Sequence, residues 1–110
     1  MGYIASMTLG EKQRLFSRLI AEHILDIYAS GYEVSLGDAK AIKRNPLEHT
    51  ENSQHYQQCA IDLNLFKDGK YLSRTEDHAE FGKRWKAKHP LCRWGGDFPK
   101  PDGNHYEFMP

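Results

Sequence analysis

Residues 59–66, with the sequence CAIDLNLF, constrain the fold more than any other stretch of the chain. Apolar and polar residues alternate along this run, which is typical of a β-strand with one face on the core. We assign Cys59, Ile61, Leu63 and Leu65 to the core face, and Ala60, Asp62, Asn64 and Phe66 to the opposite face. An ionised carboxylate is costly in such a run unless a partner compensates it. Asp62 therefore calls for an explanation beyond packing.

The segments around this strand predict an α+β fold with a small antiparallel sheet and flanking helices. We expect helices over residues 8–29 and 76–88, strands over 32–37, 71–72 and 105–108, and long loops over 38–54 and 93–104. Thr8 and Glu11 form a capping-box pattern at the start of the first helix. In the second helix, Phe81 and Trp85 are four residues apart and share the inner face.

Size and composition favour one folded domain, spanning residues 1–110, with no separate binding domain. Hydrophobic residues make up 39% and charged residues 27%, which argues against disorder. Fifteen Lys and Arg balance fifteen Asp and Glu, so charge gives no case for a nucleic-acid partner. No apolar run is long enough to predict membrane insertion, and the N-terminus lacks a signal-peptide pattern. With only Cys59 and Cys92, we expect reduced thiols and synthesis in the cytoplasm.

His55 and Asp62 form the pattern that carries chemistry, because both could point to the open face of the sheet. A neutral imidazole and a carboxylate are good zinc ligands, and catalytic zinc uses three protein ligands. His105, which begins the last strand after a Gly/Pro-rich loop, is the candidate for the third. The alternatives remain that His55 is a surface loop residue and that Asp62 caps a turn or pairs with a lysine.

Asp102 is the candidate proton acceptor for a metal-activated water, because it lies on the loop leading into His105. Glu107 competes for this role, since it shares the strand face of His105. His23 lies near the apolar stripe of the first helix, and we favour a packed or half-exposed histidine over a metal ligand. His78 and the other histidines, His49 and His89, are expected on the surface.

Two segments resemble the zinc D-Ala-D-Ala carboxypeptidase family, which includes D,D-dipeptidases and phage L-alanyl-D-glutamate endolysins. The first is Ser53-x-His55-x6-Asp62, with Ala60 two residues before the aspartate. The second is Trp-Gly-Gly-Asp-Phe at residues 94–98, followed by Asp-x-x-His-Tyr-Glu at residues 102–107. The similarity extends over residues 31–108 and implies the hedgehog/D,D-peptidase fold. Gln58 departs from the pattern, since many members have glycine there.

The resemblance implies roles for individual residues. His55, Asp62 and His105 would bind one zinc ion, and Asp102 would be the catalytic acid/base. Ser53 would orient a ligand, and a basic residue upstream would hold the substrate carbonyl or carboxylate. Arg44 is the nearest match for that residue, with Lys40 and Lys43 as rivals. Trp94 is left open between a pocket wall and a core residue.

The resemblance also implies a function, namely zinc-dependent hydrolysis of a peptidoglycan stem-peptide bond. An aspartate at position 102, where other branches have glutamate, resembles the phage endolysins and favours the L-Ala–D-Glu bond. We expect a monomer that is made in the host cytoplasm, is released by a holin and acts on the cell wall. Two alternatives stay open, a D-Ala-D-Ala carboxypeptidase or dipeptidase and a zinc-containing binding module without turnover. Other divalent ions share the ligand preferences of zinc.

Overall fold

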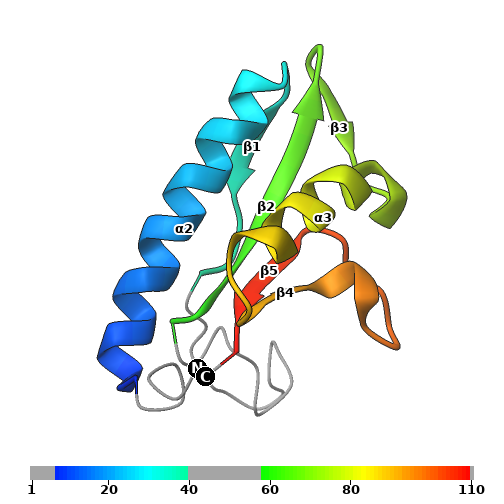
Figure 1. Cartoon of the computed structure of the whole chain (residues 1–110). Helices are drawn as coiled ribbons and strands as arrows, with labels where there is room; N and C mark the ends of the chain where they lie inside the picture. The colour runs from blue at the N-terminus through cyan, green and yellow to red at the C-terminus, as the bar shows by residue number, and fades with distance from the viewer. Residues whose placement is uncertain (1–6, 40–57, 110) are drawn as a thin grey trace.

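The computed structural model describes residues 7–39 and 58–109, and its elements are shown in Figure 1. In chain order they are α2 (Leu9–Ala29), β1 (Glu33–Leu36), β2 (Ala60–Lys67), β3 (Lys70–Leu72), the 3₁₀ helix η2 (Thr75–His78), α3 (Ala79–Lys88), β4 (Cys92–Trp94), the 3₁₀ helix η3 (Gly95–Asp97) and β5 (His105–Phe108). Two helices and an antiparallel sheet confirm the predicted α+β class.

Strand β2 organises the sheet, whose order is β1-β2-β5-β4, with β3 also paired to β2. Its first half pairs with β5, from Ala60 to Asp62, and its second half pairs with β3, from Leu65 to Lys67. Strand β1 pairs with residues 63–66 of β2, two of which also pair with β3, so β1 and β3 lie on opposite edges of β2. The long central strand thereby places the last strand of the chain beside Asp62.

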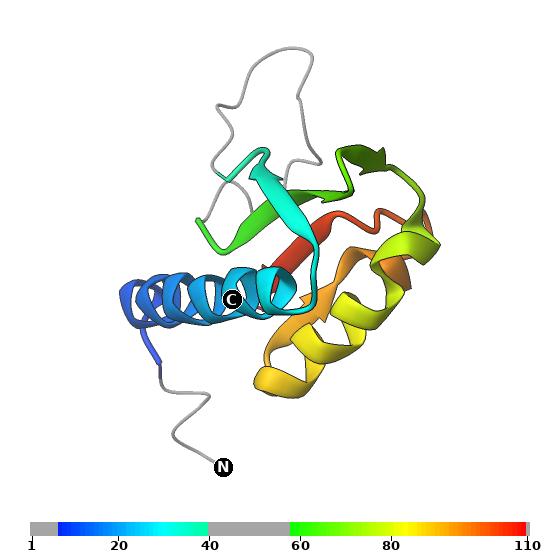
Figure 2. The ribbon, with the colours of Figure 1, turned by 90° about the horizontal axis from the view of Figure 1, so that it is seen from above.

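Both helices lie on the same side of the sheet, as Figure 2 shows. The core between helices and sheet contains Phe16, Leu19, Ile20, Ile27, Cys59, Ile61, Leu63, Leu65, Phe81, Trp85, Cys92, Trp94, Tyr106 and Phe108. The predicted core face of β2 is confirmed, because the side chains of Cys59, Leu63 and Leu65 are fully buried there. Strand alternation then directs Asp62, His105 and Glu107 to the sheet face opposite the helices.

Local signals fix the ends of several elements. Thr8 and Glu11 form the predicted capping box, with Glu11 N donating to Thr8 Oγ1 at 3.1 Å and Thr8 N donating to Glu11 Oε1 at 2.9 Å. Between β2 and β3, Asp68 and Gly69 adopt φ angles of 51° and 76°. Two successive positive φ angles are typical of the tight type I′ hairpin turn, which suits the twist of the flanking strands.

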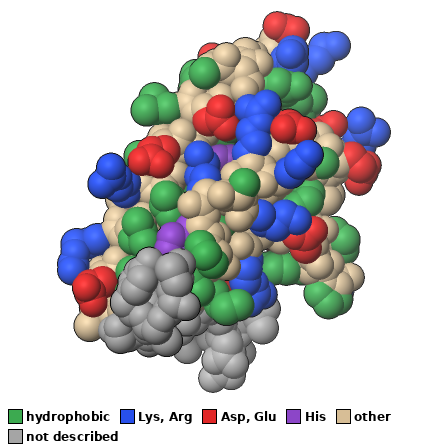
Figure 3. All heavy atoms as spheres, viewed as in Figure 1, with side chains coloured by type: hydrophobic (Ala, Val, Ile, Leu, Met, Phe, Trp, Pro, Cys, Tyr) green, Lys and Arg blue, Asp and Glu red, His purple; other side chains and the backbone are tan. Residues whose placement is uncertain are grey.

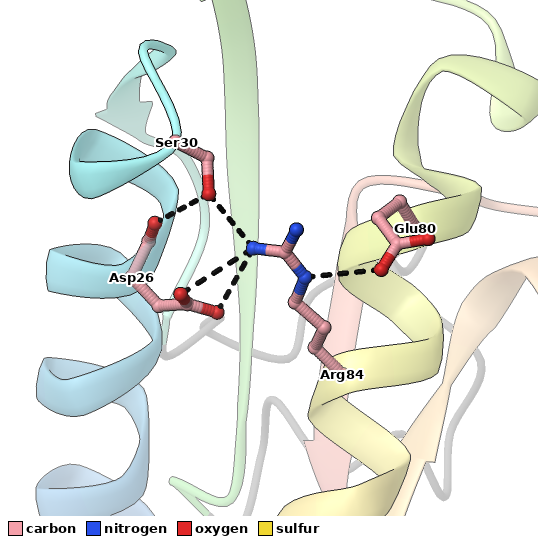
Figure 4. A network of polar contacts seen from close by, with 4 residues as sticks. All are labelled: Asp26, Ser30, Glu80 and Arg84. Carbon is pink, nitrogen blue, oxygen red and sulfur yellow. Dashed lines mark hydrogen bonds and ion pairs between the residues drawn. The ribbon is translucent and has the colours of Figure 1, made fainter.

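A polar network joins the two helices near the end of α2 (Figure 4). Arg84 Nη1 donates to Ser30 Oγ at 2.7 Å and contacts both carboxylate oxygens of Asp26 at 3.3 and 3.4 Å. Arg84 Nε donates to Glu80 Oε2 within α3 at 3.1 Å. These hydrogen bonds raise the pKa of Arg84, the one to Glu80 most. One guanidinium thus links α2 and α3.

The structure corrects three predictions about the C-terminal half. The second helix starts as η2, and regular α-helix begins only at Ala79. Part of the predicted loop 93–104 is strand β4, a three-residue element that depends on pairing with β5. His78 was expected on the surface but is only 2% exposed, and Nδ1 lies 2.9 Å from the hydroxyl of Tyr106.

The helical face viewed in Figure 3 carries positive and negative side chains interspersed over its described part. This distribution fits the net charge of zero. None of the helices among residues 7–39 and 58–109 is long and apolar enough to cross a membrane. Both cysteines are free and buried, and burial raises the pKa of each thiol, to about 12 for Cys92.

Candidate metal centre

Asp62 and His105 are direct cross-strand neighbours in the β2–β5 pair. Residues opposite each other in an antiparallel pair have side chains on the same face, a few ångströms apart. His105 Nδ1 accordingly lies 3.4 Å from Asp62 Oδ1. His105 is buried and Asp62 is partly buried. The register of one strand pair therefore brings together an imidazole nitrogen and a carboxylate oxygen that are 43 residues apart in the sequence, 105 minus 62.

Glu107 holds the other side of the His105 ring. Glu107 Oε1 lies 2.6 Å from His105 Nε2, and Glu107 Oε2 lies 3.3 Å from Arg93 Nε. Both Glu107 and His105 are buried. Burial alone would lower the pKa of His105, but hydrogen bonds to Asp62 and Glu107 raise it to about 9. A carboxylate on one ring nitrogen fixes the orientation of the imidazole and leaves Nδ1 for a metal.

The Trp-Gly-Gly-Asp motif explains how Asp102 reaches this site. Asp102 N donates to the carbonyl of Gly95 at 2.9 Å, and His105 N donates to the carbonyl of Asp102 at 3.1 Å. A Cβ on Gly95 would collide with the Asp102 carbonyl oxygen and approach His105 Cβ at 2.8 Å. Position 95 must therefore be glycine for the loop to close against the start of β5.

Trp94 anchors the same loop from the core side. Its ring is in close contact with Gly82 and Gly96, where an added Cβ on either residue would collide with it. Its Nε1 donates to the carbonyl of Gly103 at 2.7 Å. Trp94 is 8% exposed and belongs to the core cluster, and it also lines a hollow with Arg93 and Phe98, so each of the two alternatives describes part of its surroundings. It acts on the site through the backbone of the 101–104 segment.

Asp62, Asp102 and His105 form a group that could hold a metal ion. Each offers one ligand atom, and these atoms all lie within 4.8 Å of one another. Two carboxylate oxygens and one imidazole nitrogen suit zinc and other divalent first-row ions. Glu107 contacts Nε2 of His105, so the other ring nitrogen, Nδ1, points toward Asp62 and is available as a metal ligand. The donor set among the described residues therefore fits a metal.

The predicted site residues fall into three groups. Asp62, Asp102 and His105 come together, and Glu107 contacts His105 from the other side. Trp94 lies in the core, away from direct contact with the ligand atoms. His55, Ser53 and Arg44 lie outside the described residues, so their roles stay predictions.

A pocket beside Asp102 was missed by reading the sequence. It has a volume of about 230 Å³ and is lined by Tyr71, Leu72, Ser73, Thr75, His78, Pro101, Asp102, Gly103 and Asn104. Its residues come from two segments that are far apart in sequence and show no shared motif. The one available signal was the position of Asp102 itself, next to the predicted third ligand.

Two paired strands with a carboxylate–imidazole pair, a second aspartate and a glutamate on the other side of the imidazole form a site that could hold a metal ion on an α+β scaffold. A family model described as D-alanyl-D-alanine carboxypeptidase matches residues 48–108, more than half of the chain. The chain therefore belongs to the D-alanyl-D-alanine carboxypeptidase family of peptidases, as the two sequence motifs predicted.

A solved structure supports the fold. The L-Ala D-Glu endopeptidase ChiX of Serratia marcescens matches with a TM-score of 0.66 and 19% sequence identity. The match covers 91% of this chain and 85% of that chain. It confirms the predicted fold, a small antiparallel sheet with flanking helices. A comparison with curated protein sequences gives no match.

Proposed function

We propose that this chain is a zinc-dependent peptidase that cleaves an amide bond in the stem peptide of peptidoglycan. The observation that carries the proposal is the clustering of Asp62, Asp102 and His105 in a member of a peptidase family. The candidate ligand atoms of Asp62 and His105 and the carboxylate of Asp102 lie within 4.8 Å of one another, held by paired strands and a glycine-dependent loop, which supports a preorganised site.

Asp62 and His105 would hold the zinc ion together with His55. When bound, zinc supplies Lewis acidity at the scissile carbonyl and lowers the pKa of the attacking water. His105 would present Nδ1, because Glu107 engages Nε2. Ser53 would orient a ligand, and Arg44 would contact the substrate carbonyl or carboxylate. Lys40 and Lys43 are the rival basic residues for that contact.

Asp102 would move the proton. It is exposed and lines the adjacent pocket, whereas Glu107 is buried and already contacts His105 and Arg93. This difference supports Asp102 over Glu107 as the acid/base. The water oxygen bonds to the carbonyl carbon, and its proton passes to the Asp102 carboxylate. The carbon–nitrogen bond then breaks, and Asp102 gives the proton to the leaving amine.

The bond we propose is L-Ala–D-Glu, and the biological role that of a phage endolysin. The L-Ala D-Glu endopeptidase with the same fold supports this bond, and an aspartate at position 102 supports the endolysin branch. The chain would act as a monomer on the cell wall after release by a holin. The second candidate is a D-Ala-D-Ala carboxypeptidase, which the description of the matching family favours.

Digestion of purified peptidoglycan tests these roles. Zinc-loaded protein and an Asp102→Asn variant would be compared, with products read by mass spectrometry and bound zinc by elemental analysis. We expect new amino termini at D-Glu for the native chain and none for the variant, with zinc bound to both. Asn has the size of Asp but accepts no proton, so the comparison isolates proton transfer.

Other outcomes have defined meanings. Release of terminal D-Ala alone would assign the carboxypeptidase activity. No products despite one bound zinc would favour a binding module without turnover. Activity of Asp102→Asn near the native level would refute the acid/base role of Asp102.

A further inference from the structure

The pocket beside Asp102 is shaped by contact between two segments. One segment follows β3 and contributes Ser73 and Thr75, and the other precedes β5 and contributes Asp102 and Asn104. They meet where a Cβ on Gly103 would lie 2.6 Å from Thr75 Cα. Because Asp102 belongs to both the pocket and the candidate metal cluster, a molecule in the pocket lies next to the acid/base.

His78 contributes to this pocket as a neutral group. Burial lowers its pKa to about 4, so the ring is uncharged near neutral pH. Its Nδ1 lies 2.9 Å from the hydroxyl of Tyr106, a residue with no exposed surface. Within residues 7–39 and 58–109, this nitrogen is the hydrogen-bond partner of that hydroxyl.

The hydrogen bond to Tyr106 fixes the position of the proton on His78. A phenolic O–H buried without an acceptor costs free energy, so the hydroxyl of Tyr106 donates to Nδ1. A neutral imidazole that accepts at Nδ1 carries its hydrogen on Nε2. In the described part of the chain, Nε2 has no other hydrogen-bond partner, and His78 lines the pocket. The pocket thus receives a fixed, uncharged N–H donor.

The charges around the pocket determine which kind of hydrogen-bond acceptor on a ligand would suit the N–H of His78. Asp102 is the one ionisable side chain besides Tyr71 and His78 in the described lining, which contains no Lys or Arg. A carboxylate in this pocket would face Asp102 without a cation from these residues, which is unfavourable. A carboxamide or peptide carbonyl accepts from an N–H without adding charge. The hydroxyls of Ser73 and Thr75 offer further donors.

We propose that this pocket is the subsite for the leaving-group side of the substrate, and that it binds a neutral carbonyl through His78 Nε2–H. The inference rests on the proposed function, in which Asp102 protonates the leaving amine. The atoms nearest Asp102 beyond the scissile bond then belong to the residue carrying that amine. For an L-Ala–D-Glu bond, the occupant is the α-carbonyl of the D-Glu residue. The enzyme is therefore selective for stem peptides in which this carboxyl is amidated.

Two synthetic stem peptides test the selectivity. They would be identical except that the α-carboxyl of D-Glu is a carboxamide in one and a free carboxylate in the other. We expect the zinc-loaded native chain to cleave the carboxamide with roughly tenfold higher kcat/KM, which corresponds to one hydrogen bond of ordinary strength. A preference for the free carboxylate would overturn the proposal.

Substitutions at His78 separate its two nitrogens. His78→Asn keeps a polar atom near Nδ1 for Tyr106 but removes the donor at Nε2, so KM for the carboxamide rises about tenfold with kcat nearly unchanged. His78→Gln places an amide N–H near the Nε2 position and restores most of the affinity. His23→Leu is the control, because His23 packs on the same Tyr106 ring at 5.1 Å but does not line the pocket. An unchanged KM in His78→Asn would overturn the proposal.

A readout without turnover separates this inference from the proposed function. A ¹⁵N-imidazole NMR spectrum of the native chain shows which ring nitrogen of His78 carries the hydrogen. We expect it on Nε2, with a shift on adding D-isoglutamine, the α-carboxamide of D-glutamate, and none with D-glutamate. If neither stem peptide is cleaved, the proposed function fails, and this spectrum still decides the subsite. A hydrogen on Nδ1, or no response to the amide, would refute it.

Discussion

His23 allows a prediction about stability that can be worked through in numbers. Its side chain has no exposed surface, and both ring nitrogens lack a hydrogen-bond partner in the described part of the chain. The ring packs against Trp85 and Tyr106, with distances between ring centroids of 5.4 Å and 5.1 Å, respectively. Burial is the main cause that lowers its pKa from 6.5 to about 4, and the positive charges of Lys88 and Arg84 add to this.

The direction of the pH effect follows from these two pKa values. Between pH 6.5 and about 4, the unfolded chain binds a proton at His23 that the folded protein does not bind. Stability therefore falls as the pH falls through this window, and it stops changing below the folded pKa. Each pH unit in the window costs ~1.4 kcal/mol. Lowering the pH from 7 to 5 should thus remove ~2 kcal/mol through this residue alone.

His23→Leu removes this sensitivity. Leucine has a similar size and places no polar atom in the core, so at pH 7 the variant should be as stable as the native chain or more stable. At pH 5 the difference should grow by ~2 kcal/mol, and His78, whose pKa is also lowered to about 4, keeps part of the acid sensitivity in both proteins.

Urea unfolding followed by circular dichroism at pH 7, 6 and 5 measures the effect. With a slope of about 2 kcal/mol per molar, the gap between the midpoints should widen by about 1 M. If the two midpoints fall in parallel between pH 7 and 5, His23 does not titrate in this window, and the argument from burial is wrong.

One further change tests the candidate metal centre, and two test the scaffold. Glu107→Gln should weaken zinc binding by roughly 10- to 100-fold in competition with a chelator, since it weakens the hold on His105 Nε2; native affinity would contradict the orienting role. Gly95→Ala should displace the Asp102 loop from β5 and lower the free energy of unfolding by ~1–3 kcal/mol, measured by thermal unfolding. The control is Gly10→Ala in α2, which should leave the stability unchanged or raise it. Arg84→Ala should lower the melting temperature slightly and leave zinc affinity unchanged, because its half-exposed ion pairs lie at the helix junction.

The elements with strong periodicity could be predicted from the sequence. The first helix was expected over 8–29 and spans Leu9–Ala29, because a capping box and a long apolar stripe define it locally. The alternation in 59–66 located β2 within one residue and assigned its core face. Strand β4 could not be found this way, because its three residues lie in a short stretch between a proline and two glycines and become a strand only by pairing with β5.

The site shows the same division. Spacing and motif order pointed to Asp62, Asp102 and His105, which the structure brings together. The burial of His78 was not predictable, because η2 is short and turns the residue inward only where it meets Tyr106. The roles of Glu107 and Trp94 also depended on tertiary contacts. The prediction for His55 lies on a segment outside the described residues.

The two faces of strand β5 carry different kinds of side chain, and this limits which misfolded forms could retain the candidate site. His105 and Glu107 belong to the candidate metal centre, while Tyr106 and Phe108 are fully buried in the core. A shift of β5 by one residue against β2 would exchange these faces and bury the ionisable groups among apolar side chains. The burial of Tyr106 and Phe108 therefore also fixes the register that places His105 opposite Asp62 in the candidate site. A molecule in which β5 is paired out of register would lose its stability and its candidate ligand pair at the same step, so we expect no partly assembled form that keeps the site.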